Sequence, residues 1–131
     1  MNTQNIKILL ANDAEPVQLS HKLMLTEQGY RVETAGDGFE ALDKIETFDP
    51  DLILLNLTMS GLSGIECCHR IKSNETTNRI KVIMISSSTE YSKISKAFAA
   101  GCDDYVVNPI DRAELLLTVN DMLKFSHLKT V

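Results

Sequence analysis

The chain has 131 residues, 44% of them hydrophobic, which is enough for one buried core but too few for two domains. Its formal net charge of −5 leaves no basic surface to attract nucleic acid, so we expect no direct contact with DNA or RNA. The apolar stretches have the length of strands and the N-terminus lacks the features of a signal peptide, so we expect a soluble, cytoplasmic protein without membrane contact.

Five strand-like segments follow one another along the chain, each with a helix-like segment behind it. The strands are short apolar or alternating runs at residues 6–11, 31–35, 51–55, 81–85 and 105–107. Apolar residues at helical spacing come between and after them, in chain order Val17, Leu23 and Met24; Ala41, Leu42 and Ile45; Ile65 and Ile71; Ile94, Ala97 and Phe98; and Leu116, Val119 and Leu123. Strands that alternate with helices force right-handed crossovers, which predicts an α/β fold with an open, doubly wound parallel sheet.

Turn and capping residues set the expected helix boundaries. The first helix should span about residues 16–28, because a Gly-Tyr pair follows it. Ser88 or Thr89 should cap the fourth helix, which should stop near Gly101. The last helix should span about residues 111–125.

The three cysteines favour a reducing compartment over a disulfide framework, because their number is odd and two of them are adjacent. We expect Cys67, Cys68 and Cys102 to be small core residues. A metal site at Cys67-Cys68-His69 is disfavoured, because consecutive helical residues point about 100° apart and cannot converge on one ion.

Polar residues stand at the carboxyl ends of four of the five predicted strands. In open α/β sheets, ligands bind beyond these ends. The residues in question are Asn12 and Asp13 after the first strand, Asn56 after the third, Ser86 after the fourth and Asn108 after the fifth. They predict one shared site.

From about Lys7 to Lys124, the chain resembles the CheY-like receiver domain of two-component response regulators. The segments that carry the resemblance are ILLAND, GYRVETAGDGFEAL, PDLILLNLTMSGLSGIE, VIMISSS and AAGCDDYVVNPID. The resemblance implies a (βα)5 flavodoxin/CheY-like fold with five parallel strands in the order 2-1-3-4-5. It also implies a receiver domain at residues 1–125 and a C-terminal tail at 126–131, which leads into an output domain if the parent protein is longer.

The phosphorylation pocket that the resemblance implies is incomplete. A typical receiver has an acidic pair after the first strand, an acceptor Asp after the third, Ser or Thr after the fourth and Lys before Pro after the fifth. Here the pair is Asn12-Asp13, the acceptor position is Asn56 and the lysine position is Asn108, while Ser86 is retained. An amide cannot form an aspartyl phosphate. We expect no cofactor, or Mg²⁺ held weakly through Asp13.

The resemblance also assigns switch and partner residues. Ser86 and Tyr105 occupy the switch positions, and the peptide bond between Asn108 and Pro109 should be cis. The usual partner surface is formed by the fourth helix, fifth strand and fifth helix, and here it should display Lys93, Lys96, Tyr105 and Arg112. Expected partners are a histidine kinase, an output domain, another signalling protein or a second copy of the chain.

Each of these residues has a purely structural alternative. Asn12 and Asn56 can satisfy backbone groups at the strand ends. Ser86 can be a turn hydroxyl, Asp13 an acid at a helix N-terminus, and Tyr105 a strand residue with its hydroxyl in water.

These observations favour the interpretation that the chain is a signalling module without enzymatic activity, a pseudo-receiver that acts through protein contacts. One alternative is a conventional phosphorylatable receiver in which Asn56 is an engineered replacement of Asp, although Asn12 and Asn108 argue against it. A remote alternative is a flavodoxin-like cofactor binder. It is disfavoured because the segment Asn-Asp-Ala-Glu-Pro after the first strand would repel phosphate.

Overall fold

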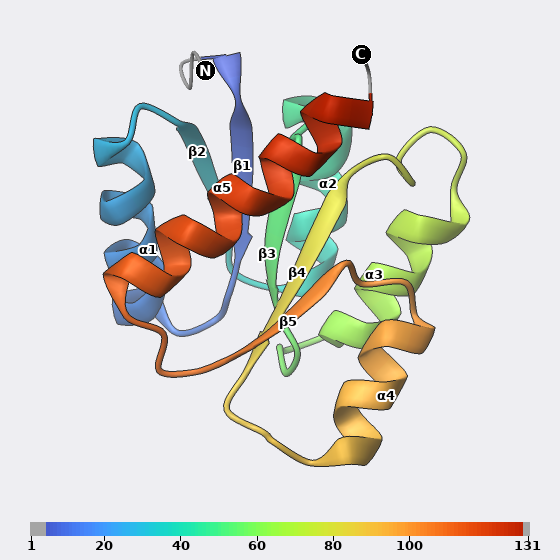
Figure 1. Cartoon of the computed structure of the whole chain (residues 1–131). Helices are drawn as coiled ribbons and strands as arrows, with labels where there is room; N and C mark the ends of the chain where they lie inside the picture. The colour runs from blue at the N-terminus through green and yellow to red at the C-terminus, as the bar shows by residue number, and fades with distance from the viewer. Residues whose placement is uncertain (1–4, 130–131) are drawn as a thin grey trace.

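Five parallel strands form one sheet in the order β2-β1-β3-β4-β5, which confirms the predicted fold and strand order (Figure 1). The computed structural model describes residues 5–129. The strands are β1 (Lys7–Ala11), β2 (Arg31–Ala35), β3 (Leu52–Asn56), β4 (Lys81–Ser86) and β5 (Asp104–Val107). The helices are α1 (Glu15–Glu27), α2 (Gly38–Phe48), α3 (Gly64–Ser73), α4 (Tyr91–Ala99) and α5 (Arg112–Lys129).

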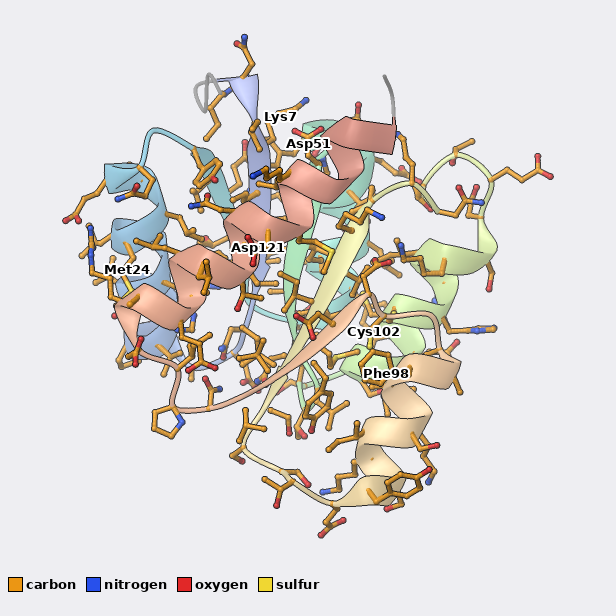
Figure 2. The ribbon with its side chains drawn as sticks, viewed as in Figure 1. Lys7, Met24, Asp51, Phe98, Cys102 and Asp121 are labelled. Carbon is orange, nitrogen blue, oxygen red and sulfur yellow. The ribbon has the colours of Figure 1, made fainter. Side chains whose placement is uncertain are left out.

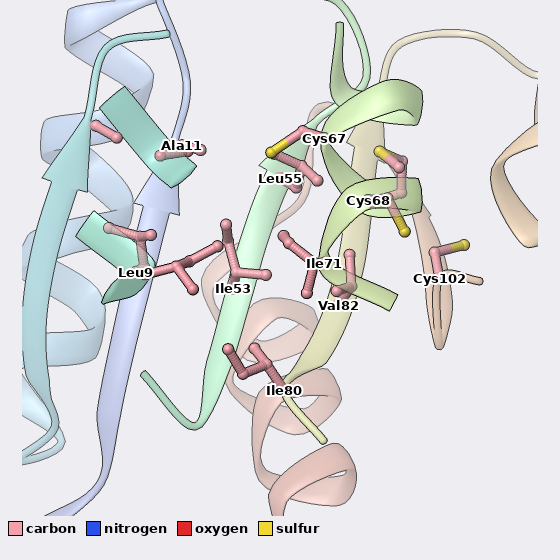
Figure 3. Packing of buried hydrophobic residues seen from close by; sticks show 14 of the residues in the cluster. Leu9, Ala11, Ile53, Leu55, Cys67, Cys68, Ile71, Ile80, Val82 and Cys102 are labelled. Atoms are coloured by element: carbon pink, nitrogen blue, oxygen red, sulfur yellow. The ribbon is translucent and has the colours of Figure 1, made fainter. Parts of the chain in front are cut away.

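Two apolar cores lie on opposite faces of the sheet. Leu9, Ile53 and Val82 are register neighbours on β1, β3 and β4, and they pack against α2, α3 and α4 (Figure 3). Their sequence neighbours, such as Leu10 and Leu54, pack against α1 and α5 on the other face. Because both faces are covered, the central strands are continuously apolar, as the sequence indicated.

Helix α1 buries a different face from the one its apolar spacing suggests. Val17 and Leu23 are exposed, whereas His21 and Leu25 are buried against the sheet. Met24 is partly buried and packs with the core between α1 and α5 (Figure 2). The prediction was wrong here because a histidine counts as polar in a hydrophobic pattern, although its ring can occupy a core position.

Three further details differ from expectation. Neither Ser88 nor Thr89 caps α4: Glu90 is at the N-cap position, and the Ser88 hydroxyl accepts a hydrogen bond from the Glu90 amide, at 3.1 Å. Phe98 of α4 is exposed. Helix α5 continues to Lys129, beyond its expected end near residue 125, because neither Gly nor Pro interrupts it. The expected tail is therefore helical as far as Lys129, and residues 130 and 131 lie outside the described residues.

The three cysteines are free thiols in the core, as predicted. Burial raises the pKa of Cys67 and of Cys102 to about 12, and that of Cys68 to about 11. Among residues 5–129, no helix is both long and apolar enough to cross a bilayer.

Candidate functional site

The polar residues expected at one edge of the sheet lie at the carboxyl ends of neighbouring strands. Asn12 follows β1, Asn56 ends β3, Ser86 ends β4 and Asn108 follows β5. The Asn56 side-chain nitrogen lies 3.5 Å from Oδ1 of Asn12. The main-chain amide of Asn108 donates to the carbonyl of Ser86, at 2.8 Å. Strand pairing thus brings Asn12 next to Asn56, and Ser86 next to Asn108.

The side chain of Asn12 is buried and has a structural role. Its Oδ1 accepts a hydrogen bond from the amide of Ala14 at 2.8 Å, which shapes the turn that leads into α1. The side-chain amide of Gln18 donates to the main-chain carbonyls of Asn12, at 3.1 Å, and of Ala35, at 2.9 Å. Sequence reasoning missed Gln18, because a single polar residue on a helix carries no signal of such a contact.

The side-chain amide nitrogen of Asn56 faces two oxygen atoms. Its Nδ2 donates to the main-chain carbonyl of Thr58 at 2.8 Å and faces Oδ1 of Asn12. Both neighbours are hydrogen-bond acceptors. A carboxylate in the same position would face two oxygen atoms with no proton to donate, and would be repelled. In this orientation the side chain at position 56 acts as a hydrogen-bond donor, which Asn can do and an ionised Asp cannot.

Gly64 lets the first turn of α3 pack directly against the end of β3. A Cβ atom at this position would lie 2.2 Å from the carbonyl oxygen of Asn56 and 2.8 Å from Cα of Leu57. The amide of Gly64 also donates to the carbonyl of Leu57, at 2.9 Å. This contact fixes the backbone that carries Asn56.

The donor set around Asn56 does not fit Mg²⁺ well. Asp13 is the carboxylate expected to hold the ion, and its side chain is exposed. The oxygen of Asn12 is already engaged by Ala14. Among the described residues, no three His, Cys, Asp or Glu side chains are grouped so that they could hold a metal ion. Mg²⁺ usually relies on one or two carboxylates within a near-octahedral set of oxygen ligands, and here Asp13 is the single carboxylate of the expected ligand set, so the site offers the ion weak support.

The two switch positions are connected through the loop after β4. Ser86 is buried, and its Oγ accepts a hydrogen bond from the amide of Ser88 at 3.0 Å. The hydroxyl of Tyr105 donates to the carbonyl of Ser88 at 2.9 Å. Ser86 therefore acts as a turn hydroxyl, and Tyr105 is hydrogen-bonded to the protein as well as partly exposed.

Asn108 lies at the turn after β5. The peptide bond between Asn108 and Pro109 is cis, as the resemblance implied. Asn108 is partly exposed and lines a pocket together with residues of α1.

The residues expected on the partner face are exposed or, in the case of Tyr105, partly exposed. Lys93 and Lys96 are exposed on α4, and neither forms an ion pair with another described residue. Arg112 is exposed as well, and its guanidinium pairs with Glu27 of α1, at 2.8 Å.

Sequence reasoning missed the apolar part of this surface. Tyr91 and Phe98 of α4 are exposed, and so is Val107 of β5. Tyr91 and Phe98 are seven positions apart, which places them on the same side of the helix. The seven-residue spacing of these two aromatic residues is the sequence signal for this apolar surface. The helical pattern instead predicted Phe98 to face the core.

Comparison with known proteins identifies the family. Residues 8–120 match the family model described as "Response regulator receiver domain". The chain is 35% identical over 118 residues to the phosphate regulon transcriptional regulatory protein PhoB of Rhizobium meliloti (strain 1021), covering 90% of this chain and 52% of that protein. It is 34% identical over 122 residues to the transcriptional regulatory protein ResD of Bacillus subtilis (strain 168), covering 93% of this chain and 50% of that protein. The chain spans about half the length of these curated relatives.

Solved structures agree with this assignment. A putative response regulator from Chloroflexus aurantiacus superposes with a TM-score of 0.86 at 28% identity, over 91% of this chain and 98% of that one. The chemotaxis response regulator CheY4 of Vibrio cholerae gives a TM-score of 0.85 at 26% identity, over 89% and 98% of the two chains. The chain belongs to the response regulator receiver domain family.

Proposed function

We propose that this chain is a pseudo-receiver, a signalling module that works through protein contacts without forming an aspartyl phosphate. The observation that carries the proposal is the side chain at the carboxyl end of β3. Asn56 stands there, and its amide nitrogen donates to Thr58 and faces Asn12. Phosphotransfer to a receiver needs a carboxylate at position 56.

Phosphoryl transfer to a receiver requires an ionised carboxylate that attacks phosphorus and a cation that neutralises the developing charge. The amide of Asn56 carries no negative charge and cannot form the acyl phosphate bond. The single carboxylate of Asp13 gives a cation little support. Both requirements are therefore unmet in the described site.

The alternative in which Asn56 alone is an engineered change is less well supported. Asn12 and Asn108 are also amides at positions where a typical receiver has charged groups. Asn12 is buried and engaged with both Ala14 and Asn56, so it belongs to the same hydrogen-bonded arrangement. A designer who wished to prevent phosphorylation would have no reason to change these two residues as well.

The surface through which we propose the chain acts is the exposed side of α4 and β5. It combines the positive charges of Lys93 and Lys96 with the apolar side chains of Tyr91, Phe98 and Val107. We propose that it contacts another protein in the cytoplasm, such as a kinase, an output domain or a second copy, without direct contact to nucleic acid. The relatives are about twice as long as the matched segment, which supports an output domain in a longer parent protein.

Such a module needs two conformations of unequal population, not a phosphate. A free-energy difference of a few kcal/mol, about 2 to 3, already favours one conformation strongly. The bonds that connect Ser86, Ser88 and Tyr105 supply interactions that can differ between the two conformations.

The test is a phosphorylation assay on the chain beside its Asn56→Asp variant. Both are incubated with acetyl phosphate and excess Mg²⁺ and analysed by intact mass, and beryllofluoride binding is followed by NMR. Asn74→Asp serves as the control, because Asn74 lies in an exposed turn and accepts its hydrogen bonds through Oδ1, as an aspartate also does.

We expect no phosphoryl adduct on the parent chain or on Asn74→Asp. An adduct on Asn56→Asp alone would show that Asn56 is the main block. No adduct on any of the three would show that the whole pocket is inactive. A Mg²⁺-dependent adduct on the parent chain would overturn the proposal.

A further inference from the structure

A pocket of about 490 Å³ opens between α1 and the segment that follows β5. Its walls come from three separate parts of the chain. The lining residues are Pro16, Val17, Ser20 and His21 of α1, Ser87 of the loop after β4, and Asn108, Pro109 and Ile110 after β5. This volume lies within the range of pockets that hold small organic molecules, about 300 to 1,000 Å³.

His21 gives this pocket an imidazole ring whose nitrogen atoms form no hydrogen bond with the described residues and are open to the pocket. The residue is only 6% exposed, yet it lines the pocket. Within the described part of the chain, no hydrogen bond reaches its imidazole ring. Because these nitrogen atoms are accessible and unbonded, they are free to form a hydrogen bond with a bound molecule.

The imidazole of His21 is suited to bind a neutral group. Burial lowers its pKa, so the ring is uncharged at neutral pH. A neutral imidazole has one N–H donor and one nitrogen acceptor. It can therefore pair with a hydroxyl, an amide or a ring nitrogen of a ligand.

The remaining walls favour an uncharged ligand. None of the eight lining residues is Lys, Arg, Asp or Glu. Val17, Pro109 and Ile110 offer apolar contact, while Ser20 and Asn108 offer further hydrogen bonds. A charged ligand would lose hydration here without gaining an ionic partner from the walls.

We propose that this pocket binds a small, uncharged, largely apolar organic molecule and that His21 holds it through a hydrogen bond. The molecule contacts α1 on one side and the turn at Asn108 on the other. The pocket binds its ligand whether or not Asn56 prevents phosphorylation. The two proposals can therefore fail independently.

The test is an NMR titration of the full chain with matched probes. The neutral probes are 4-ethylphenol and benzamide, and the charged probes of similar size are benzoate and benzylammonium. We expect saturable shifts of the amides of Ser20, His21 and Asn108 with the neutral probes. We expect far weaker responses to the charged probes.

Variants connect the binding to His21. His21→Phe preserves the ring but removes the hydrogen bond, and it should weaken binding about five- to tenfold, as expected for the loss of one hydrogen bond. His69→Phe, the same change at an exposed site on α3, should leave affinity unchanged. Val17→Trp at the exposed rim should block the pocket without disturbing the core.

Three results would overturn the proposal. They are equal binding of charged and neutral probes, unaltered affinity in both His21→Phe and Val17→Trp, and shifts that map away from the pocket. Circular dichroism of each variant shows whether it is folded, so a folded Val17→Trp variant decides the question even where His21→Phe unfolds.

Discussion

The phenolic hydroxyl of Tyr105 donates a hydrogen bond to the main-chain carbonyl of Ser88, which ties β5 to the loop that leads into α4. The amide of Ser88 in turn donates to the hydroxyl of Ser86, at the end of β4. Two hydrogen bonds therefore link Ser86 of the candidate site to Tyr105, which lies next to the exposed face of α4 and β5. A change at either end alters the same loop.

Tyr105→Phe tests this connection. The substitution removes one partly buried hydrogen bond and should lower the free energy of unfolding by about 1 kcal/mol. It should also shift the NMR amide signals of Ser88 and Glu90, because the Ser88 carbonyl loses its donor and the Ser88 hydroxyl bonds to the Glu90 amide. Tyr91→Phe is the control, since Tyr91 is 84% exposed. Equal effects of the two substitutions would contradict the assigned role of Tyr105.

We expect that a side chain at position 64 would destabilise the protein, whereas a methyl group at position 36 would be tolerated. In Gly64→Ala, the new Cβ would overlap the carbonyl of Asn56, so we expect destabilisation of about 3 kcal/mol. Gly36 has no heavy atom within 4 Å of an added Cβ, so Gly36→Ala should change stability by no more than about 0.5 kcal/mol. Urea denaturation of both variants measures the difference. Similar midpoints would show that α3 does not pack on β3 as described.

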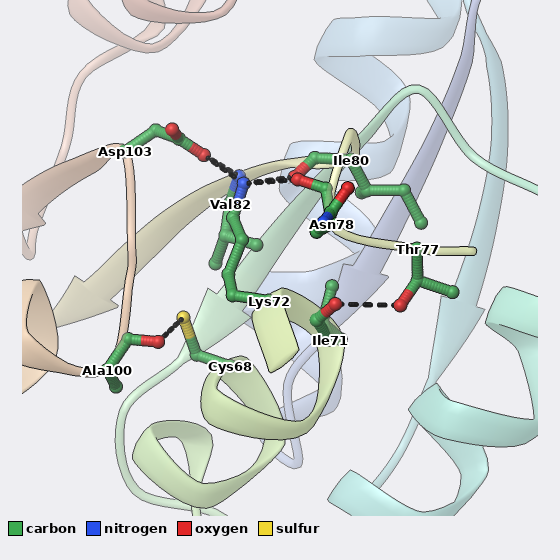
Figure 4. A network of polar contacts seen from close by, with 9 residues as sticks. All are labelled: Cys68, Ile71, Lys72, Thr77, Asn78, Ile80, Val82, Ala100 and Asp103. Carbon is green, nitrogen blue, oxygen red and sulfur yellow. Dashed lines mark hydrogen bonds and ion pairs between the residues drawn. The ribbon is translucent and has the colours of Figure 1, made fainter. Parts of the chain in front are cut away.

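Lys72 stabilises the edge of the sheet opposite the site (Figure 4). Its ammonium lies 2.8 Å from the carboxylate of Asp103 and 2.6 Å from the carbonyl of Ile80, and the same carboxylate accepts from the amide of Val82 at 2.8 Å. The side chains of Lys72 and Asp103 are only 16% and 25% exposed. Lys72→Met removes the ammonium from three acceptors, the Asp103 carboxylate and the carbonyls of Asn78 and Ile80, and should cost about 2 kcal/mol.

The matched control for this prediction is Lys44→Met. The pair of Lys44 with Glu33 has a similar distance, 3.0 Å, but its side chains are 35% and 42% exposed. Its loss should cost about 0.5 kcal/mol, as for other surface pairs. If thermal melts show equal losses for the two variants, the network around Lys72 contributes no more than a surface ion pair.

The sequence predicted much of the fold, because strands buried on both faces are continuously apolar and easily recognised. It also predicted which polar residues lie at the carboxyl edge of the sheet, since polar residues at strand ends converge in any open parallel sheet. The sequence did not predict contacts that depend on tertiary packing. The burial of His21, the bonds of Gln18 and the pairing of Arg112 with Glu27 all depend on how α1 lies against its neighbours. No local pattern encodes them.

His21 should make the stability of the protein depend on pH in the acidic range. Burial lowers its folded-state pKa below the ordinary value of 6.5, so the unfolded chain binds more protons than the folded chain below pH 6.5. Stability contributed by the neutral ring is therefore present above that pH and is lost as pH falls below it. The measurement is the free energy of unfolding at pH 7.5 and pH 5.5 for the parent chain, His21→Phe and His69→Phe. The parent chain and His69→Phe should lose more stability between the two pH values than His21→Phe does, because the acidic residues contribute equally in all three. An equal loss in all three would mean that the pKa of His21 is the same in the folded and unfolded protein, and that its ring is not buried as described.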